Sequence, residues 1–334
     1  MRIPKTLSYS SFSLCEKSPE EFYTQYLSPN APTRTPQGPP LAVGSSFDAY
    51  VKAALHHDLF GGGADPRYEF SALFESQVEK QNWDFALRAG KHVFKAYKVC
   101  GAYNDLLFWL KKAIKPPRFE FRIERAIDGV PFMGKPDCQF VLNLGQGDFD
   151  NVYDWKVRGY CSKYATSPSK GYATCLDTFQ SKPSRSHGKE HALYMPRDFH
   201  GLTINAGFLE TCSTDYADQL CLYSWILGET PGDENVVLGI EEIVSKCMGE
   251  GVKPDLRYAR HRALCRKEYQ LKLLERIHSV WDRIISGHFF NDMSKEDSDA
   301  RCEVLDEVAA GQKLDGGETG EWFNDVARPM YFRK

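Results

Sequence analysis

The sequence predicts an α/β (α+β) fold in which strands gather in the middle of the chain and helices lie before and after them. From Phe119 to Val157, short apolar runs alternate with turn residues, which is typical of strands joined by hairpins. From Val43 to His57, the apolar residues Phe47, Val51 and Leu55 recur every four positions, which indicates a helix with one buried face. A chain of 334 residues is also long enough to bury a substantial core.

The N-terminal region of the chain, residues 1–115, is predicted to be mainly helical. Its first helix runs from about Pro19 to Leu27, with Ser18 as the N-cap, a proline in the first turn and Glu21 completing a capping box. The predictions that follow are a Pro- and Thr-rich linker over 31–40, the helix over 43–57, a break at the three glycines 61–63 and two or three helices over 68–115.

Beyond the predicted strands, residues 158–202 form a long polar segment rich in Gly, Pro and Ser, where no regular structure is expected. A helix over 213–227 ends at Gly228, with Pro231 beyond it. The remaining predictions are a strand over 203–210, a strand over 236–244, a long helix over 256–286 and a short helix after Ser294. We expect one domain over 1–334, made of the helical N-terminal region 1–115, a catalytic core of 116–157 and 203–245, the insert 158–202, the long basic helix 253–290 and a C-terminal helix and tail over 291–334.

Two short segments in the strand-rich region carry most of the chemical information. One is Gly134-Lys135-Pro136-Asp137 and the other is Asp154-Trp155-Lys156. Side chains alternate along a strand, so Asp154 and Lys156 should point to one face and Trp155 to the other. Turn residues at 144–148 would fold one strand back beside the other and bring Asp137 alongside. Two carboxylates and an amine in one small volume suit a divalent cation and an activated water.

This constellation resembles the PD-(D/E)XK nucleases, with Asp137 in the first half-motif and Asp154-Trp155-Lys156 as the second. The resemblance extends to the RecB-like exonuclease branch over roughly residues 7 to 290, in the order along the chain that is typical of that branch. The supporting matches are a strand-turn-strand pattern over 120–137, the Gln-x-x-x-Tyr pattern of Gln219 and Tyr223, and Gly44-x-x-x-Asp48 where the branch has Gly-x-x-x-His. The resemblance implies a restriction-endonuclease-like core, with a central mixed β-sheet flanked by helices, in a phage-type member of the branch.

The resemblance also implies a metal site. Asp137, Asp154 and the main-chain carbonyl of Trp155 would bind Mg²⁺, for which Mn²⁺ would substitute, because Mg²⁺ prefers oxygen ligands. The ion would stabilise the charge that develops on the phosphate and activate a water, which Lys156 would orient or deprotonate. Asp48 would be a further ligand. Its alternative role is an ion pair with Lys52, one helical turn away.

Three further residues are implied catalytic positions. Gln219 and Tyr223 lie one helical turn apart and share a face, which in the family looks onto the active site. The alternative for Tyr223 is a plain core aromatic. Glu120 stands at the upstream acidic position of the family, but Glu124 lies on the same strand face, and both assignments stay open.

The net charge of −3 argues against a general polyanion binder, so we expect local basic segments to contact DNA. In the insert, aromatic and basic residues are interspersed, as in proteins that stack on bases while cations follow the backbone. The alternative is a disordered surface loop. The candidate DNA-binding residues of the insert are Arg158, Tyr160, Lys163, Tyr164, Lys170 and Lys182.

The same insert contains residues that could bind other metals. His187-Gly-Lys-Glu-His191 matches a metalloprotease pattern, but Gly188 and Pro196 argue against the helix which that pattern requires. A structural zinc ion shared by Cys161, Cys175, His187 and His191 stays open as an alternative. No iron–sulfur cluster is expected, because Cys15, Cys265 and Cys302 lack the clustered partners that such clusters use in this branch.

The ten cysteines contain no Cys-x-x-Cys pair and indicate reduced thiols. With no apolar run near the ~18 residues of a membrane span, we expect no membrane association and a place in the cytoplasm of a bacterium or phage-infected host cell. The expected function is a Mg²⁺-dependent DNA exonuclease in recombination, repair or phage DNA processing, acting on linear ends with a single strand passing the active site. No P-loop occurs, so a helicase would be a separate partner, as would a recombinase or a single-strand-binding protein. The alternatives are an endonuclease on branched or flapped DNA and an inactive nucleic-acid-binding module.

Overall fold

The computed structural model describes residues 1–32, 36–61, 65–119, 121–143, 145, 147–161, 172–175, 192–193, 207–246 and 255–314. The strands within these ranges are β1 (Arg118–Phe119), β2 (Ile123–Ile127), β3 (Val130–Gly134), β4 (Cys138–Asn143), β5 (Asp148–Arg158), β6 (Tyr172–Cys175), β7 (Ala192–Leu193), β8 (Val236–Lys246) and β9 (Asp255–Ala263). Seven of the described strands form one mixed sheet in the order β1-β4-β5-β8-β9-β6-β7, and β2 and β3 form a separate hairpin. The predicted mixed α/β architecture with a central sheet is confirmed.

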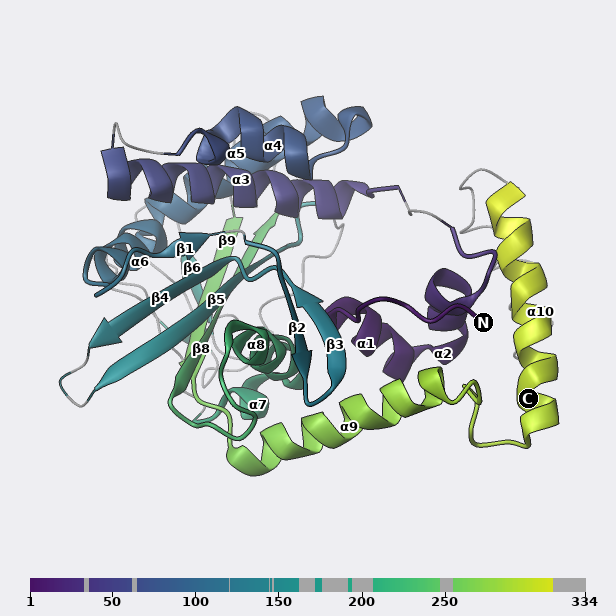
Figure 1. The fold of residues 1–334 in the computed structure, drawn as a ribbon. Helices are drawn as coiled ribbons and strands as arrows, with labels where there is room; N and C mark the ends of the chain where they lie inside the picture. Colours follow the sequence, from purple (N-terminus) through teal and green to yellow (C-terminus); the bar gives the residue numbers. More distant parts are fainter. Residues whose placement is uncertain are drawn as a thin grey trace.

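Helices cover both faces of this sheet (Figure 1). The helices are α1 (Tyr9–Lys17), α2 (Pro19–Phe22) with its π-helical continuation η1 (Tyr23–Leu27), α3 (Pro39–Phe60), α4 (Phe70–Gln77), α5 (Trp83–Val99), α6 (Ala102–Lys111), α7 (Leu209–Cys212), α8 (Thr214–Leu227), α9 (Lys267–Ile285) and α10 (Lys295–Leu314). Helices α3, α5 and α6 pack on one face, whereas α8 packs on the other, with α1 and α9 beyond it. No helix in the described ranges is both long and apolar enough to cross a membrane.

The central strand β5 separates two hydrophobic clusters, and its middle residues are buried on both sides. Tyr153 and Trp155 point into the cluster beneath α3, α5 and α6, while Val152 points into the cluster beneath α8. This alternation follows from the period of two along a strand. It puts Asp154 and Lys156 on the α8 side of the sheet, as the sequence predicts.

Strands β4 and β5 form the predicted antiparallel hairpin, with Cys138 opposite Tyr153. Strands β5 and β8 are parallel neighbours. Parallel neighbours need a crossover connection, and α8 forms a section of this one. The crossover therefore lays α8 over the face of β5 that carries the candidate site.

The predicted long helix over 256–286 is wrong in its first section. Strand β9 occupies Asp255–Ala263 and pairs with β8 along its length, and helix α9 begins only at Lys267. The basic composition of this strand resembles a solvated helix face. Arg260 is nevertheless buried, because its charge is compensated by Glu241 on the neighbouring strand. Only that tertiary pairing makes a strand favourable here.

Smaller differences concern helix ends. Helix α1 was not predicted, although Ser8 and Ser11 form a capping box at its start. The side chain of Ser18 makes no capping hydrogen bond, so the predicted box with Glu21 does not form. Helix α3 begins at Pro39, inside the predicted linker, because proline fits the first turn of a helix.

Several other predictions are confirmed, and two are not. The insert 158–202, in which no regular structure was expected, contains strands β6 and β7 of the sheet. Helices α4, α5 and α6 lie within the predicted segment 68–115, and α8, β8 and α10 match their predictions, although α10 is longer than the short helix expected. The predicted strand over 203–210 is not found among its described residues, because Leu209 and Glu210 begin α7. Phe208 makes only a single bridge, to Leu264.

Candidate active site

The β4–β5 hairpin places Asp137 beside Asp154. Asp137 stands one residue before β4, and its Oδ2 accepts a hydrogen bond from the main-chain N–H of Trp155 at 2.9 Å. The carboxyl groups of Asp137 and Asp154 are close enough that the charge of Asp137 raises the pKa of Asp154. The two half-motifs therefore meet, and the contact is made at the residue between Asp154 and Lys156.

Helix α8 completes this side of the site. Gln219 Nε2 donates to Asp154 Oδ2 at 3.3 Å and to the hydroxyl oxygen of Tyr223 at 3.0 Å. The ammonium group of Lys156 forms an ion pair with Asp154. Because Gln219 and Tyr223 are one helical turn apart, a single face of α8 reaches the carboxylate.

Helix α3 contributes a third carboxylate, Asp48, and a buried lysine, Lys52. The Nζ of Lys52 lies 2.7 Å from Asp48 Oδ2 and 2.9 Å from Asp137 Oδ1, and its side chain is only 1% exposed. The helical ion pair between Asp48 and Lys52 thus forms, and the same lysine also reaches Asp137. The sequence indicates Lys52 only as the partner of Asp48, through their i,i+4 spacing. Nothing local indicates its contact with Asp137.

These side chains line an open cavity of about 660 Å³ between α3, β5 and α8. The cavity wall also includes Gly44 and Gln77, on the sides formed by α3 and α4. The polar lining at the centre consists of Asp48, Lys135, Asp137, Asp154, Lys156 and Gln219. A cavity of this size, with charged groups converging on its floor, is a candidate active site.

The three carboxylates titrate unlike surface carboxylates. Burial raises the pKa of Asp48 to about 7, although the charge of Lys52 opposes the shift. Burial and the nearby charge of Asp137 raise the pKa of Asp154 to about 7. Burial alone would also raise the pKa of Asp137, but Lys52, the hydrogen bond from Asp154 and Lys156 hold it below its usual value. Strongly shifted carboxylates in a cavity are typical of functional sites.

The donor set fits a hard divalent cation. Asp48 Oδ1 is buried without a hydrogen-bond partner, and an unpaired buried carboxylate oxygen is unfavourable unless a cation or donor meets it. Among the described residues, no three His, Cys, Asp or Glu side chains form a ready metal cluster. Mg²⁺ does not require one, because it is commonly held by one or two carboxylates and several waters. Asp137 and Asp154 supply that number.

A buried polar network supports the site from the far side of the sheet. The indole Nε1 of Trp155 donates to Glu241 Oε2 at 3.1 Å, and Glu241 is fully buried. Arg260 Nε donates to Glu241 Oε1 at 2.7 Å, and the hydroxyls of Tyr153 and Tyr97 donate to the same carboxylate. These residues were not predicted from the sequence. The sequence signal for this network would have been a glutamate and an arginine at strand positions that are expected to be buried.

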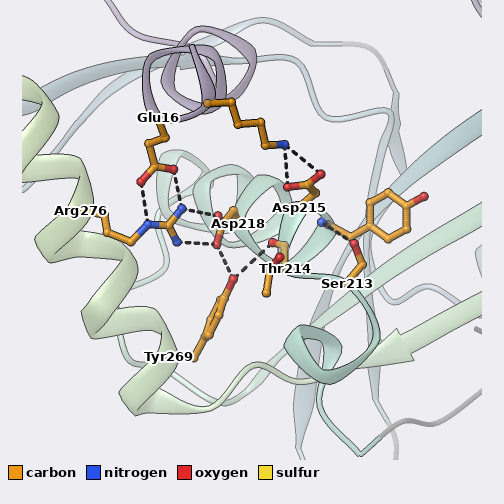
Figure 2. Close-up of polar contacts among 9 residues, drawn as sticks. Glu16, Ser213, Thr214, Asp215, Asp218, Tyr269 and Arg276 are labelled. Atoms are coloured by element: carbon orange, nitrogen blue, oxygen red, sulfur yellow. Dashed lines mark hydrogen bonds and ion pairs between the residues drawn. The ribbon is translucent and has the colours of Figure 1, made fainter. Parts of the chain in front are cut away.

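Helix α8 is anchored by ion pairs at its N-terminal end (Figure 2). The guanidinium of Arg276, on α9, bridges Glu16 of α1 and Asp218 of α8. Lys17 pairs with Asp215 at 2.9 Å. Asp218 precedes Gln219 directly, so these contacts fix the turn of α8 that faces Asp154.

Of the remaining predicted residues, some lie outside the described part of the chain and the others have different contacts. Glu120, Lys163, Tyr164, Lys170 and Lys182 lie outside the described residues, as do the side chains of Cys175, His187 and His191 among the proposed zinc ligands. Arg158 pairs with Glu242 at 3.3 Å and contacts Tyr216. The ring of Tyr160 packs edge-on against Phe85 and His92. Glu124 is on the β2–β3 hairpin, where it pairs with Arg122.

Comparisons with known proteins add little. No protein-family model matches the chain. No curated protein matches it either. Among solved structures, a protein from Eubacterium rectale that is provisionally named an exonuclease matches with a TM-score of 0.40 and 13% identity, over 84% of this chain and 80% of that one. A likeness this low carries no argument about fold or function, so any functional conclusion rests on the geometry of the site.

Proposed function

We propose that this chain is a Mg²⁺-dependent DNA nuclease that hydrolyses phosphodiester bonds, with the site of a RecB-like PD-(D/E)XK exonuclease. The observation that carries the proposal is the meeting of Asp137, Asp154 and Lys156 on the floor of one cavity, with Gln219 and Tyr223 facing Asp154. These residues come from a hairpin and a crossover helix that are far apart in sequence. A surface ion pair on an edge strand would not gather them.

Each side chain has a role that its contacts support. Asp137 and Asp154, with the carbonyl of Trp155, would hold Mg²⁺ or Mn²⁺, and Asp48 would add a ligand through its unpaired Oδ1. The bound ion would supply Lewis-acid stabilisation of the phosphate charge and an acidified water. Lys156 would orient that water and face the scissile phosphate. Gln219 would hold the carboxylate of Asp154 in its ligating orientation.

Linear DNA is the proposed substrate, and removal of nucleotides from an end is the proposed mode. The resemblance favours an exonuclease of recombination, repair or phage DNA processing, with the segment 158–202 as the strand guide. The partners proposed beyond DNA are a recombinase, a single-strand-binding protein or a separate helicase. Cleavage of branched or flapped DNA is the alternative mode for the same site.

The test compares end-labelled linear DNA with closed circular DNA, in Mg²⁺ and then in EDTA. Mg²⁺-dependent loss of label from the linear substrate, with the circle intact, is the expected result. Nicking of the circle would favour the endonuclease, and DNA binding without cleavage in either Mg²⁺ or Mn²⁺ would leave only a binding module.

Matched variants test the residues. Asp154→Asn should abolish cleavage while DNA binding persists, and Lys156→Met should abolish cleavage while metal binding persists. Asp148→Asn is the control, because Asp148 lies on the same strand but is exposed and bonds only locally, to Asn143. Near wild-type cleavage by Asp154→Asn would overturn the site assignment.

A further inference from the structure

Lys52 is an unusual component of a metal site, because it is a buried cation among the carboxylates. It lies in the middle of α3, and its side chain is 1% exposed. A buried ammonium group is strongly unfavourable unless carboxylates compensate it. The carboxylates that do so here are Asp48, on the same helix, and Asp137, which is 85 residues away in sequence.

The ammonium group of Lys52 lies where a metal ion that bridges two carboxylates would lie. Its Nζ lies 2.7 Å from an oxygen of Asp48 and 2.9 Å from an oxygen of Asp137, so two carboxylates from different elements meet on one positive charge. In two-metal hydrolases, two ions share the site and lie roughly 3.5–4 Å apart. Here, the Asp48 side of Asp137 is already held by Lys52.

The other side of Asp137 faces the hairpin. Its Oδ2 accepts a hydrogen bond from the N–H of Trp155, which directly follows Asp154 in β5. The site is therefore divided into a half that contains Lys52 and a half formed by Asp137 and Asp154. A divalent ion bound between Asp137 and Asp154 would share the Asp137 carboxylate with Lys52. A second divalent ion between Asp48 and Asp137 would have to compete with the ammonium group of Lys52 for the same carboxylate oxygens.

Resting on the proposed function, we infer that Lys52 occupies the place of a second metal ion and that the site therefore binds a single divalent cation, at Asp137 and Asp154, with Asp48 Oδ1 as its further ligand. Lys52 is a positioning residue in this arrangement. It holds Asp48 and Asp137 in their orientation when no ion is bound, and it sets the number of ions that can bind.

The experiment counts Mn²⁺ ions bound per chain by electron paramagnetic resonance of free Mn²⁺ during titration. Ions that still bind to Asp154→Asn are treated as unrelated to the site. The wild type should bind one ion. Lys52→Met, which keeps the length of the side chain without its charge, should bind two. Its thermal unfolding midpoint in EDTA should fall and should recover when Mn²⁺ is added.

Lys135→Met is the matched control. Lys135 lines the same cavity but is exposed, so its removal deletes one positive charge without opening a position between Asp48 and Asp137. This variant should still bind one ion, and Mn²⁺ should raise its unfolding midpoint by no more than it raises that of the wild type. A second ion in Lys135→Met would mean that the total charge, rather than the position of Lys52, limits the number of ions.

The outcomes separate this inference from the proposed function. Two site ions in the wild type would overturn the inference and leave a metal-dependent nuclease intact. No site ion in the wild type, together with no cleavage in Mg²⁺ or Mn²⁺, would overturn the proposed function itself. A folded Lys52→Met that binds one ion with unchanged affinity would also overturn the inference. If Lys52→Met does not fold even with Mn²⁺, the number of site ions bound by the wild type still tests the inference, because two ions would overturn it.

Discussion

The main-chain N–H of Trp155 donates a hydrogen bond to Asp137 at 2.9 Å, and this contact joins the two half-motifs of the site. The indole N–H of the same residue donates to Glu241 on the opposite face of the sheet. Trp155 therefore connects the carboxylates in the cavity to a buried polar network beneath them. The orientation of Asp137 therefore depends on a residue whose indole is held by Glu241.

The buried network should contribute strongly to stability. Arg260→Met would leave Glu241 buried without its cationic partner, so we expect the free energy of unfolding to fall by about 3–5 kcal/mol in urea denaturation. Arg262→Met, on the same strand, removes a hydrogen bond to the uncharged Asn151 and should cost only about 0.5–1.5 kcal/mol. Equal losses in the two variants would argue that the charge of Glu241 is compensated in another way.

The close packing of β3 against α8 should determine the position of the Tyr223 ring. A Cβ atom at Gly134 would lie 2.2 Å from Ile226 Cδ1 and 3.0 Å from Tyr223 Cδ1. We expect Gly134→Ala to lower the free energy of unfolding by about 1–3 kcal/mol and to reduce cleavage, because the side chains of Ile226 and Tyr223 must shift.

Gly44→Ala is the control for this variant. No atom lies within 4 Å of a Cβ placed at Gly44, which is in a helix and borders the cavity. Alanine should therefore be neutral or stabilise the helix by up to about 1 kcal/mol. Urea denaturation and cleavage assays on both variants check the pair, and a neutral Gly134→Ala would contradict the close packing.

The anchoring of α8 can be tested at two ion pairs of different burial (Figure 2). Arg276→Met would leave Asp218 with 7% exposure and without its charged partner, so we expect a loss of about 1–3 kcal/mol and weaker cleavage through displacement of Gln219. Lys17→Met breaks a pair whose side chains are 59% and 58% exposed, and should cost about 0–1 kcal/mol. Similar effects on cleavage from both variants would contradict the role given to Arg276.

The buried side chain of His261 predicts that the stability of the protein depends on pH. The Nδ1 of His261 lies 3.2 Å from Cys212 Sγ, and its Nε2 lies 3.6 Å from Glu242 Oε2. Arg158 and Tyr216 contact the other oxygen of the same carboxylate, Oε1. Burial alone would lower the pKa of His261, but the contacts with Cys212 and Glu242 raise it to about 9. Because the folded pKa lies above the unfolded value of about 6.5, the stabilisation is complete below about pH 6.5 and is lost as the pH rises through about 9.

The measurement is urea denaturation between about pH 6 and about pH 10. The wild type should lose on the order of 3 kcal/mol across that range from this group, and His261→Gln should remove that share of the slope. A slope that is unchanged in His261→Gln would assign the pH dependence to other groups.

Local patterns were enough to predict much of this chain. The β4–β5 hairpin joins neighbouring segments through a short turn, so alternation along the strands already placed Asp154 and Lys156 on one face and Trp155 on the other. The end of helix α8 was predicted because Gly228 and the proline beyond it are local signals. The pairing of Gln219 with Tyr223 follows from helical geometry alone.

Tertiary structure decided what depends on charges meeting across the chain. The basic sequence of β9 is typical of a solvated helix, so a helix was predicted there. The structure instead has a strand, in which Glu241 compensates the charge of buried Arg260. The contact of Lys52 with Asp137 joins residues 85 positions apart, and no periodicity encodes it. A buried charge is stable only beside its counter-charge, and the fold determines where that partner lies. The sequence by itself thus determined that Asp137, Asp154 and Lys156 lie together, and the packing of α3 on the hairpin decided that Lys52 lies beside Asp137.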